Sequence, residues 1–262
     1  MKISVIIPTY NSENIITKLI ERIIIVLDSI ESNLNYEIIL INDFSFDDSW
    51  KIIENLSKKY KFLKGISLKK NYGQHNAIMC GLKYSSGDVI ITMDDDFQHE
   101  PEFIKKIYLE LQNNKTEVCY TYYLNRKHSL FKRTISWFNN LFTTWFLGKP
   151  FNLYLSSFRG FKSTIRDKLL DFKNPNVYID GLIIKSTKKI SMISIVHFER
   201  LNGNSNYTLK KLLLLWRSML INYESNSFKP TNFIRSLLKY FVLFFKNKKD
   251  NNEQYSVAKK TF

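Results

Sequence analysis

The sequence predicts an α/β protein built on a mostly parallel central sheet with helices on both faces. Short apolar runs rich in β-branched residues recur through the first hundred residues, which is typical of buried strands. Segments with helical spacing separate these runs. Because strand–helix–strand alternation brings each strand back beside an earlier one, we expect parallel strands covered on both sides.

The expected strands and helices follow one another along the first half of the chain. The strands are Ile3–Ile7, Ile38–Ile41 and Val89–Thr92. The spacing predicts two helical faces: Ile15, Leu19, Ile23 and Val26 in the first helix, and Ile52, Ile53 and Leu56, behind a cap at Asp47 or Ser49, in the second. In parallel sheets, ligands bind beyond the carboxyl ends of the strands. The segments at those ends are therefore candidates for a site: Pro8–Asn11, Asn42–Phe46, Lys70–Gly73 and Asp94–Gln98.

The second half of the chain has a different texture. Leu130–Leu147 is expected to be a helix crowded with aromatic residues, and Leu209–Tyr223 and Phe233–Phe245 mix apolar runs with Lys and Arg. No stretch reaches the roughly 18–20 uncharged apolar residues that span a bilayer. We therefore expect C-terminal amphipathic helices at a membrane interface, with one over residues 226–248, and a disordered tail over residues 249–262.

The positive charge is concentrated in the second half. The net charge is +15, yet residues 1–110 hold 13 Lys and Arg against 16 Asp and Glu, whereas residues 111–262 hold 26 against 8. This asymmetry indicates an anionic partner: nucleic acid, an anionic membrane leaflet or a phosphorylated acceptor. The two cysteines lack metal-ligand spacing, and reduced thiols in a cytoplasmic protein are the better interpretation.

Three adjacent carboxylates stand directly after the third expected strand, at Asp94, Asp95 and Asp96. They repel one another, and a divalent cation would relieve that repulsion. Mg²⁺ or Mn²⁺ prefers oxygen ligands and binds through one or two carboxylates plus substrate phosphates. Residues two apart at a strand end point the same way, so Asp94 and Asp96 are the expected metal ligands. The competing interpretation is an acidic turn that caps the next helix.

A further carboxylate, Asp43, ends the second strand. It could accept a hydrogen bond from the NH of a nucleotide base, or form an Asx-turn before the next helix. Other nucleotide folds lose support, because the eight glycines contain no Gly-x-Gly and no Gly-Lys-Ser/Thr loop follows a strand. Neither a His-Cys zinc cluster nor a Gly-x-Ser-x-Gly elbow is present.

Four segments in order carry a resemblance to family 2 glycosyltransferases with the GT-A fold: Pro8-Thr9-Tyr10-Asn11, Asn42-Asp43-Phe44-Ser45, Lys70-Asn71-Tyr72-Gly73-Gln74-His75 and Met93-Asp94-Asp95-Asp96-Phe97-Gln98. The resemblance covers roughly residues 1–225. It implies a nucleotide-sugar-binding half over residues 1–125 and an acceptor-binding half over residues 126–225. Within the family the chain looks most like the polyprenyl-phosphate sugar transferases, the group of dolichyl-phosphate mannose synthases and undecaprenyl-phosphate aminoarabinose transferases.

The resemblance also implies roles for single residues. Asp94 and Asp96 would bind the metal, and Arg159, Arg200 and Ser205 would face the acceptor phosphate. The catalytic candidates are Asp96, Arg200 and Asp180. The residues expected at the nucleotide-sugar are Pro8, Tyr10, Glu13, Asp43, Asn71, Gly73, Asp94, Asp95 and Gln98.

The expected reaction is inverting transfer from a nucleotide-sugar, with UDP implied by the resemblance, to a polyprenyl phosphate. A phosphate is already anionic at neutral pH, so its attack on the anomeric carbon needs no protein base. If the acceptor were instead a sugar hydroxyl of a surface polysaccharide or lipid-linked oligosaccharide, a carboxylate base would be required, and Asp180 is the candidate.

A more distant alternative is a nucleic-acid-binding protein. The basic half lacks a recognisable reading motif, and its cations lie among bulky apolar residues, which favours a membrane surface over nucleic acid. We therefore expect a cytoplasmic enzyme bound peripherally to the inner face of the cell membrane. A homo-oligomer, with an aromatic helix packed against a second subunit, is the remaining partner to consider.

Overall fold

One eight-stranded sheet forms the centre of the molecule, in the strand order β7-β5-β6-β4-β1-β2-β3-β8. The structure is a computed structural model that describes residues 1–31, 33–97, 99–123, 143–144, 148–195 and 253–262. Parallel pairing joins four neighbours in the middle: β4 (Val89–Thr92), β1 (Lys2–Thr9), β2 (Asn35–Asn42) and β3 (Leu63–Leu68). The expected parallel α/β fold is confirmed in this part of the chain.

Antiparallel pairing enters at both sides of this parallel centre. β6 (Arg159–Lys162) lies antiparallel between β4 and β5 (Val118–Tyr123), and β7 (Ile190–Ile195) is parallel to β5. β8 (Val257–Lys260) runs antiparallel along β3. The reversal at β6 matters for the site, because it brings the start of β6 beside the carboxyl end of β4, where Thr92 pairs with Arg159.

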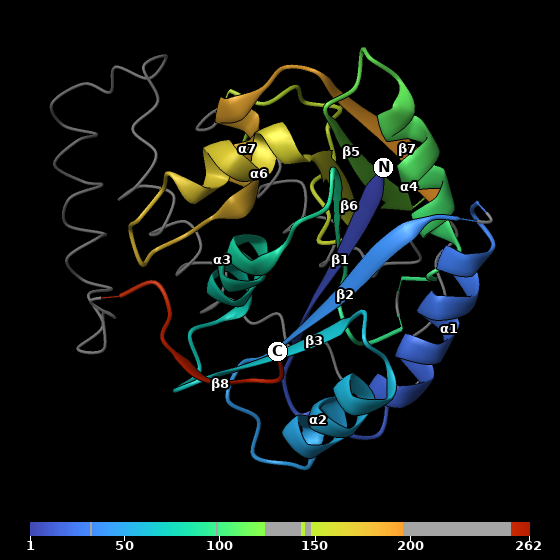
Figure 1. The fold of residues 1–262 in the computed structure, drawn as a ribbon. Helices are drawn as coiled ribbons and strands as arrows, with labels where there is room; N and C mark the ends of the chain where they lie inside the picture. Colours follow the sequence, from blue (N-terminus) through green and yellow to red (C-terminus); the bar gives the residue numbers. More distant parts are fainter. Residues whose placement is uncertain (32, 98, 124–142, 145–147, 196–252) are drawn as a thin grey trace, which may run out of the picture.

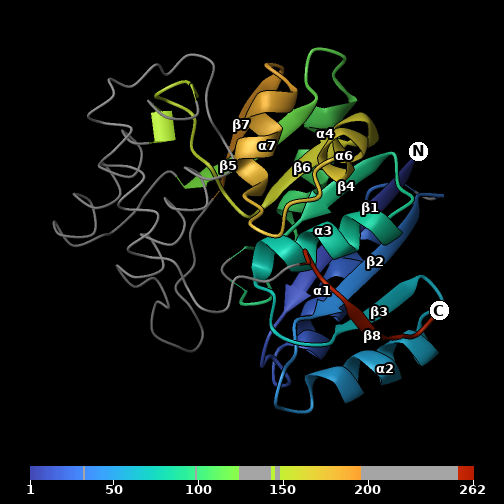
Figure 2. The ribbon, with the colours of Figure 1, turned by 90° about the vertical axis from the view of Figure 1, so that its left-hand side faces the viewer.

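Helices cover both faces of the sheet (Figures 1 and 2). One face carries α1 (Ile16–Asp28), α2 (Ser49–Lys59) and α4 (Phe103–Gln112). The other carries α3 (Gln74–Tyr84), α6 (Ser163–Leu170) and α7 (Ile179–Ser186). Figure 1 shows α1 and α4 on one side of the strands and α3, α6 and α7 on the opposite side.

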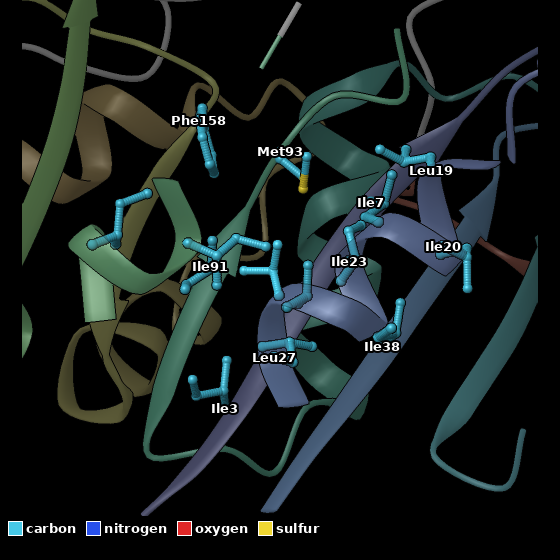
Figure 3. Close-up of a cluster of buried hydrophobic side chains, with 14 of the residues drawn as sticks. Ile3, Ile7, Leu19, Ile20, Ile23, Leu27, Ile38, Ile91, Met93 and Phe158 are labelled. Carbon is cyan, nitrogen blue, oxygen red and sulfur yellow. The ribbon is translucent and has the colours of Figure 1, made fainter. Parts of the chain in front are cut away.

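The strands of the centre are buried on both faces, which explains their unbroken apolar sequence. In β1, Ile3, Val5 and Ile7 belong to the core under α1 and α4, whereas Ile6 belongs to the core under α3. Figure 3 shows the first of these cores, where Ile7 and Ile91 of the sheet meet side chains of α1. Alternate residues of one strand thus fill two separate cores, because successive side chains point to opposite faces.

The C-terminal tail corrects one prediction. Residues 249–262 are polar and were expected to be disordered, yet Val257–Lys260 form β8 at the edge of the sheet. The backbone of Thr261 donates a hydrogen bond to the carbonyl of Gly65, and the amide of Gly65 donates one to Oγ1 of Thr261. Composition misled the prediction, because an edge strand needs backbone partners on one side only and few apolar side chains.

The predicted helices of the second half lie mostly outside the part of the chain that the structure describes. This holds for Leu209–Tyr223 and Phe233–Phe245, and for all of Leu130–Leu147 except residues 143–144, which are helical. Among the described residues, no helix combines the length and apolar character that crossing a bilayer requires. The interfacial helices therefore stay a prediction.

Close packing of α4 against β6 gives a stability test. A Cβ at Gly160 would clash with Cγ2 of Ile107 and lie 2.9 Å from Cδ1 of Leu111. We expect Gly160→Ala to destabilise the protein by about 1–3 kcal/mol, because an overpacked core forces side chains off their rotamers. Urea unfolding measures this loss. Adding Ile107→Ala vacates the space, so the double variant should lose less than the two single losses combined; strict additivity would contradict the packing argument.

Candidate active site

The strands β1, β2 and β4 end along one edge of the sheet, and most of the predicted site residues lie there. Thr9 of β1 pairs with Asn42 of β2, and Ile6 of β1 pairs with Thr92 of β4. The segments that begin at Tyr10, Asp43 and Met93 therefore leave neighbouring strands. The sheet itself brings together three segments that are far apart in the sequence.

Left-handed backbone conformations gather at this edge. The non-glycine residues with positive φ in the described part of the chain are Asn11 (φ 53°), Phe44 (φ 64°) and Phe97 (φ 56°). Each lies within a few residues of a strand end, and Gly73 (φ 85°) precedes α3 on the same side. A bulky residue in this region costs free energy, and such residues concentrate at binding sites. The backbone thus marks the same edge as the polar side chains.

Asp43 anchors the loop that precedes α3. Its Oδ1 accepts a hydrogen bond of 2.8 Å from the amide of Tyr72, and its Oδ2 accepts one of 2.8 Å from the amide of Gly73. Asn71 donates through Nδ2 to the carbonyl of Asp43 at 3.2 Å. Burial raises the pKa of Asp43, and the two amide hydrogen bonds oppose that rise. Asp43, Asn71 and Gly73 were all predicted at the nucleotide, and the structure joins them in one hydrogen-bonded unit.

An exposed aromatic group stands beside this unit. Tyr10 is 45% exposed and Phe46 is 76% exposed, with their ring centroids 6.5 Å apart, and Phe44 lies 5.4 Å from Phe46. Asn11 accepts a hydrogen bond from the amide of Phe46 through Oδ1, which ties the two loops together. Large exposed rings at a strand end offer a stacking surface for a planar ligand. Sequence reasoning found Tyr10 but missed Phe46.

Pro8 and Glu13 have mainly structural surroundings. Pro8 is a buried residue of β1, paired with Ile41. The Oε2 of Glu13 accepts a hydrogen bond of 2.8 Å from the amide of Asp48, and the amide of Glu13 donates to Asp47. These two bonds fasten the start of α2 to the loop before α1. These bonds give Glu13 a role in holding the site loops. Its contact with the nucleotide-sugar stays a prediction.

Asp94 and Asp95, the first two of the three carboxylates after β4, bond to different segments. Asp94 accepts hydrogen bonds from Nε2 of Gln74 at 2.5 Å and from Oγ of Ser157 at 2.7 Å. Asp95 accepts one from the amide of Tyr10 at 3.3 Å and a short one from Oγ of Ser12. Asp94 therefore bonds to the first residue of α3 and to a residue just before β6, and Asp95 bonds to the loop after β1. Asp95 holds that loop in place, a function that the sequence did not predict.

Electrostatics distinguish this strand end from an ordinary acidic turn. Burial raises the pKa of Asp94, and the nearby Asp96 carboxylate raises it further. Burial likewise raises the pKa of Asp95 to about 6, with Asp94 and Asp96 adding to the rise. Partly buried carboxylates that repel one another favour the binding of a cation, and oxygen is the ligand type that Mg²⁺ and Mn²⁺ prefer. Asp94 and Asp96 thus fit a divalent metal.

A cluster of three or more His, Cys, Asp or Glu side chains arranged to hold a metal is absent from the described part of the chain. Two carboxylates are nevertheless enough where the substrate supplies phosphate oxygens, because Mg²⁺ keeps few protein ligands in such sites. A metal site of this kind at Asp94 and Asp96 stays a prediction.

Arg159 and Asp180 form a buried ion pair under the site. Arg159 is 1% exposed and Asp180 is 7% exposed, and Nη1 of Arg159 bonds to Oδ1 of Asp180. The hydroxyl of Tyr120 donates to the same oxygen at 2.8 Å. Burial alone would lower the pKa of Arg159, but Asp180 and Tyr120 together more than offset this, so that the pKa is raised. Sequence reasoning predicted Arg159 at the acceptor and Asp180 as a base; the structure pairs them with each other.

Three predicted site residues, Gln98, Arg200 and Ser205, lie outside the described residues. Conversely, several residues that hold the site were not predicted: Ser12, Gln74, Ser157 and Tyr120. Gln74 stood inside a motif that the sequence had singled out. Ser12, Ser157 and Tyr120 carried no local signal, because their partners lie 83, 63 and 60 residues away along the chain.

The fold and this edge place the chain among α/β proteins that bind a ligand at the carboxyl ends of parallel strands. The chain belongs to glycosyl transferase family 2, whose sequence model matches residues 4–171. The predicted family and the predicted enzyme class are thereby confirmed.

Two curated proteins of the same name are similar to this chain over most of its length. Undecaprenyl-phosphate 4-deoxy-4-formamido-L-arabinose transferase of Proteus mirabilis is 33% identical over 220 residues, which cover 84% of this chain and 67% of that protein. The enzyme of the same name from Photorhabdus laumondii matches with the same identity and the same coverage. This chain thus aligns with about two thirds of the length of these relatives.

Solved structures match at the level of the fold. Glucosyl-3-phosphoglycerate synthase of Mycobacterium tuberculosis, crystallised with Mn²⁺, uridine diphosphate and glucosyl-3-phosphoglycerate, superposes with a TM-score of 0.61 at 17% identity, covering 86% of this chain and 81% of that one. TarS of S. aureus superposes with a TM-score of 0.55 at 19% identity, covering 93% of this chain and 43% of that one.

Proposed function

We propose that the enzyme transfers a sugar from a UDP-sugar to a polyprenyl phosphate with inversion at the anomeric carbon. The observation that carries this proposal is the shared edge of β1, β2 and β4, where the Asp43 loop and the Asp94–Asp96 carboxylates meet. One end of this edge suits a base and the other a diphosphate with its cation. The uridine diphosphate and Mn²⁺ bound by the fold neighbour support the same assignment.

At the nucleotide end, the rings of Tyr10 and Phe46 would offer a face for the base. Asp43 has each oxygen already engaged by one amide, and a carboxylate oxygen has room for a second donor such as a base NH. The same carboxylate holds the amides of Tyr72 and Gly73 in place. Asp43 would thus bind the base and orient the neighbouring loop together.

At the diphosphate end, Asp94 and Asp96 would hold Mg²⁺ or Mn²⁺, which would offset the charge that builds on the leaving nucleoside diphosphate. Gln74 and Ser157 fix the Asp94 carboxylate from two sides, so its direction is set before the donor arrives. Asp95 holds the β1 loop, which carries Tyr10. The chain's own contribution is therefore a prearranged set of oxygens and loops.

The state of Asp180 supports a phosphate acceptor over a sugar hydroxyl. A hydroxyl acceptor needs a base, and Asp180 was the candidate. Its Oδ1 accepts hydrogen bonds from Arg159 and Tyr120, and the guanidinium neutralises its charge. An acceptor hydroxyl would have to compete with both donors for this oxygen. The names of the relatives, which specify undecaprenyl phosphate, point the same way. We further propose a peripheral enzyme on the inner face of the membrane, where such a lipid would be met.

A donor screen tests the proposal. Purified enzyme, Mn²⁺ and undecaprenyl phosphate are incubated with UDP-sugars and GDP-sugars, and released nucleotide is measured together with label in the lipid fraction. Transfer from a UDP-sugar into lipid, abolished by EDTA, is expected. Sugar transfer only to a glycan hydroxyl, or lipid transfer unaffected by EDTA, would contradict the acceptor or the metal assignment respectively.

The base pocket has its own test in Asp43→Ala. We expect the variant to bind uridine diphosphate about 10- to 100-fold more weakly, because losing a hydrogen bond to a charged group costs roughly 1.5–3 kcal/mol. Calorimetry without sugar or acceptor measures the change. Asp167→Asn, at an exposed residue of α6, is the control and should bind normally. Unchanged affinity in a folded Asp43→Ala variant would leave Asp43 as a structural turn residue alone.

A further inference from the structure

Residues 253–256 lie against the Asn71–Gln74 loop, at the start of α3. Oε1 of Glu253 accepts a hydrogen bond of 2.6 Å from the hydroxyl of Tyr72, which is 6% exposed. Burial raises the pKa of Tyr72 to about 12, and the bond to Glu253 contributes to this rise. The amide of Lys69 donates to the carbonyl of Ser256 at 2.9 Å. Glu253, 181 residues further along the chain, thus bonds to the loop through its side chain, and the backbone of Ser256 bonds to Lys69 just before it.

A second set of bonds ties the tail to the segment before α7. Nε2 of Gln254 donates to the carbonyls of Phe172 and Asn174, at 2.7 and 3.1 Å. From that segment, the carbonyl of Pro175 accepts a bond of 3.0 Å from Nδ2 of Asn76, which also bonds to the carbonyl of Tyr72 at 2.9 Å. The tail, the segment before α7 and the start of α3 therefore close a ring of hydrogen bonds around Tyr72.

Tyr72 connects this ring to both ends of the donor site. Its amide, with that of Gly73, is held by the Asp43 carboxylate. Two residues further on, Gln74 donates to Asp94. Three consecutive positions, Tyr72–Gln74, thus join the tail to the predicted base ligand on one side and the predicted metal ligand on the other. Red β8 and its approach to α3 can be followed in Figure 1.

We propose that Glu253 and Tyr72 are positioning residues for the nucleotide-sugar, acting through the Asn71–Gln74 loop. This inference rests on the proposed function. Without the Glu253 bond, the buried Tyr72 hydroxyl loses its acceptor, and the loop gains freedom that nucleotide binding must then remove. Glu253 lies beyond residues 4–171, the part of the chain that the family model matches, so the proposal assigns a donor-site role to a segment outside that match.

The test uses full-length Tyr72→Phe and Glu253→Ala and their double variant. Each single variant should raise the Kd for uridine diphosphate about three- to tenfold, since only part of one charged hydrogen bond is transmitted to the ligand. The double variant should be no weaker than the worse single variant, because both remove one bond. The KM for the donor should rise with Kd, while kcat changes less than about twofold. Hydrogen exchange at the amides of Tyr72 and Gly73 should be faster in Glu253→Ala.

Tyr36→Phe is the matched control. The hydroxyl of Tyr36 donates to Oδ1 of Asp28 at 2.8 Å, the same kind of bond, but near the amino end of β2. This variant should keep wild-type nucleotide affinity. If the wild type binds uridine diphosphate and the Tyr72 and Glu253 variants bind it equally well, the positioning role is refuted and the proposed function stands. An equal loss in Tyr36→Phe would also refute it, since the effect would be general. A wild type that binds neither uridine nor guanosine diphosphate would overturn both proposals.

Discussion

Asp94→Asn is expected to lower kcat by about 10²- to 10³-fold while leaving the protein folded. The carboxylate lies at a strand end. Asn keeps one oxygen to accept the bond from Gln74, and its NH2 group can donate to the hydroxyl oxygen of Ser157. What the variant loses is the negative charge that would hold a divalent cation against the diphosphate. Removing one preorganised electrostatic contact of this kind costs a rate factor of that order. Turnover is measured over a series of Mn²⁺ concentrations, and the concentration for half-maximal activity should rise.

Asp96→Asn should give a comparable loss, because the two carboxylates are predicted to share one cation. Asp167→Asn carries the same chemical change on the exposed surface of α6 and should retain full activity. Near-normal turnover of Asp94→Asn or Asp96→Asn would be incompatible with the shared site. So would a wild-type enzyme that works equally well in excess EDTA.

The second large effect is expected at the buried ion pair. Asp180→Asn should lower the free energy of unfolding by about 3–5 kcal/mol, because it leaves the Arg159 guanidinium buried without its counter-charge. Urea unfolding followed by circular dichroism measures the loss. Replacing both partners with apolar residues, Arg159→Met and Asp180→Leu, should recover most of the stability, because two buried charges are then removed together.

The exposed pair Arg166–Asp167 provides the comparison. Asp167→Asn should change the free energy of unfolding by less than about 1 kcal/mol, since solvent screens an exposed ion pair. The Asp180 result also separates the two acceptor hypotheses. A general base would give a variant of wild-type stability that turns over very slowly. That outcome would contradict a structural role for Asp180 and restore the sugar hydroxyl as acceptor.

The central strands were predictable because their signal is local. Val89–Thr92 has the bounds that the sequence predicted, and the strands at Ile3–Ile7 and Ile38–Ile41 lie inside β1 and β2. Unbroken β-branched runs are buried on both faces of a parallel sheet, and few other structures accept them. Once the strands were placed, the segments after them followed. This is why Tyr10, Asp43 and Asp94 were correctly expected at one edge.

The partners of those residues were decided by the tertiary structure. Gln74 and Ser157 reach Asp94 from 20 and 63 residues away, and no pattern within a single segment encodes such a pair. Arg159 and Asp180 each looked like a functional group when considered alone. Only their meeting across β6 and α7 turns them into a neutralised pair.

The sequence by itself determined the parallel centre, the family and the edge that carries the acidic residues, because periodicity and strand-end motifs are properties of short segments. The tertiary structure decided what each carboxylate does, since hydrogen bonds and burial depend on residues that meet only after folding. Glu253 is the clearest case. Its segment looked disordered by composition, yet β8 pairs along β3 and carries its carboxylate to Tyr72. A polar tail became ordered because the sheet edge offered it unpaired backbone groups.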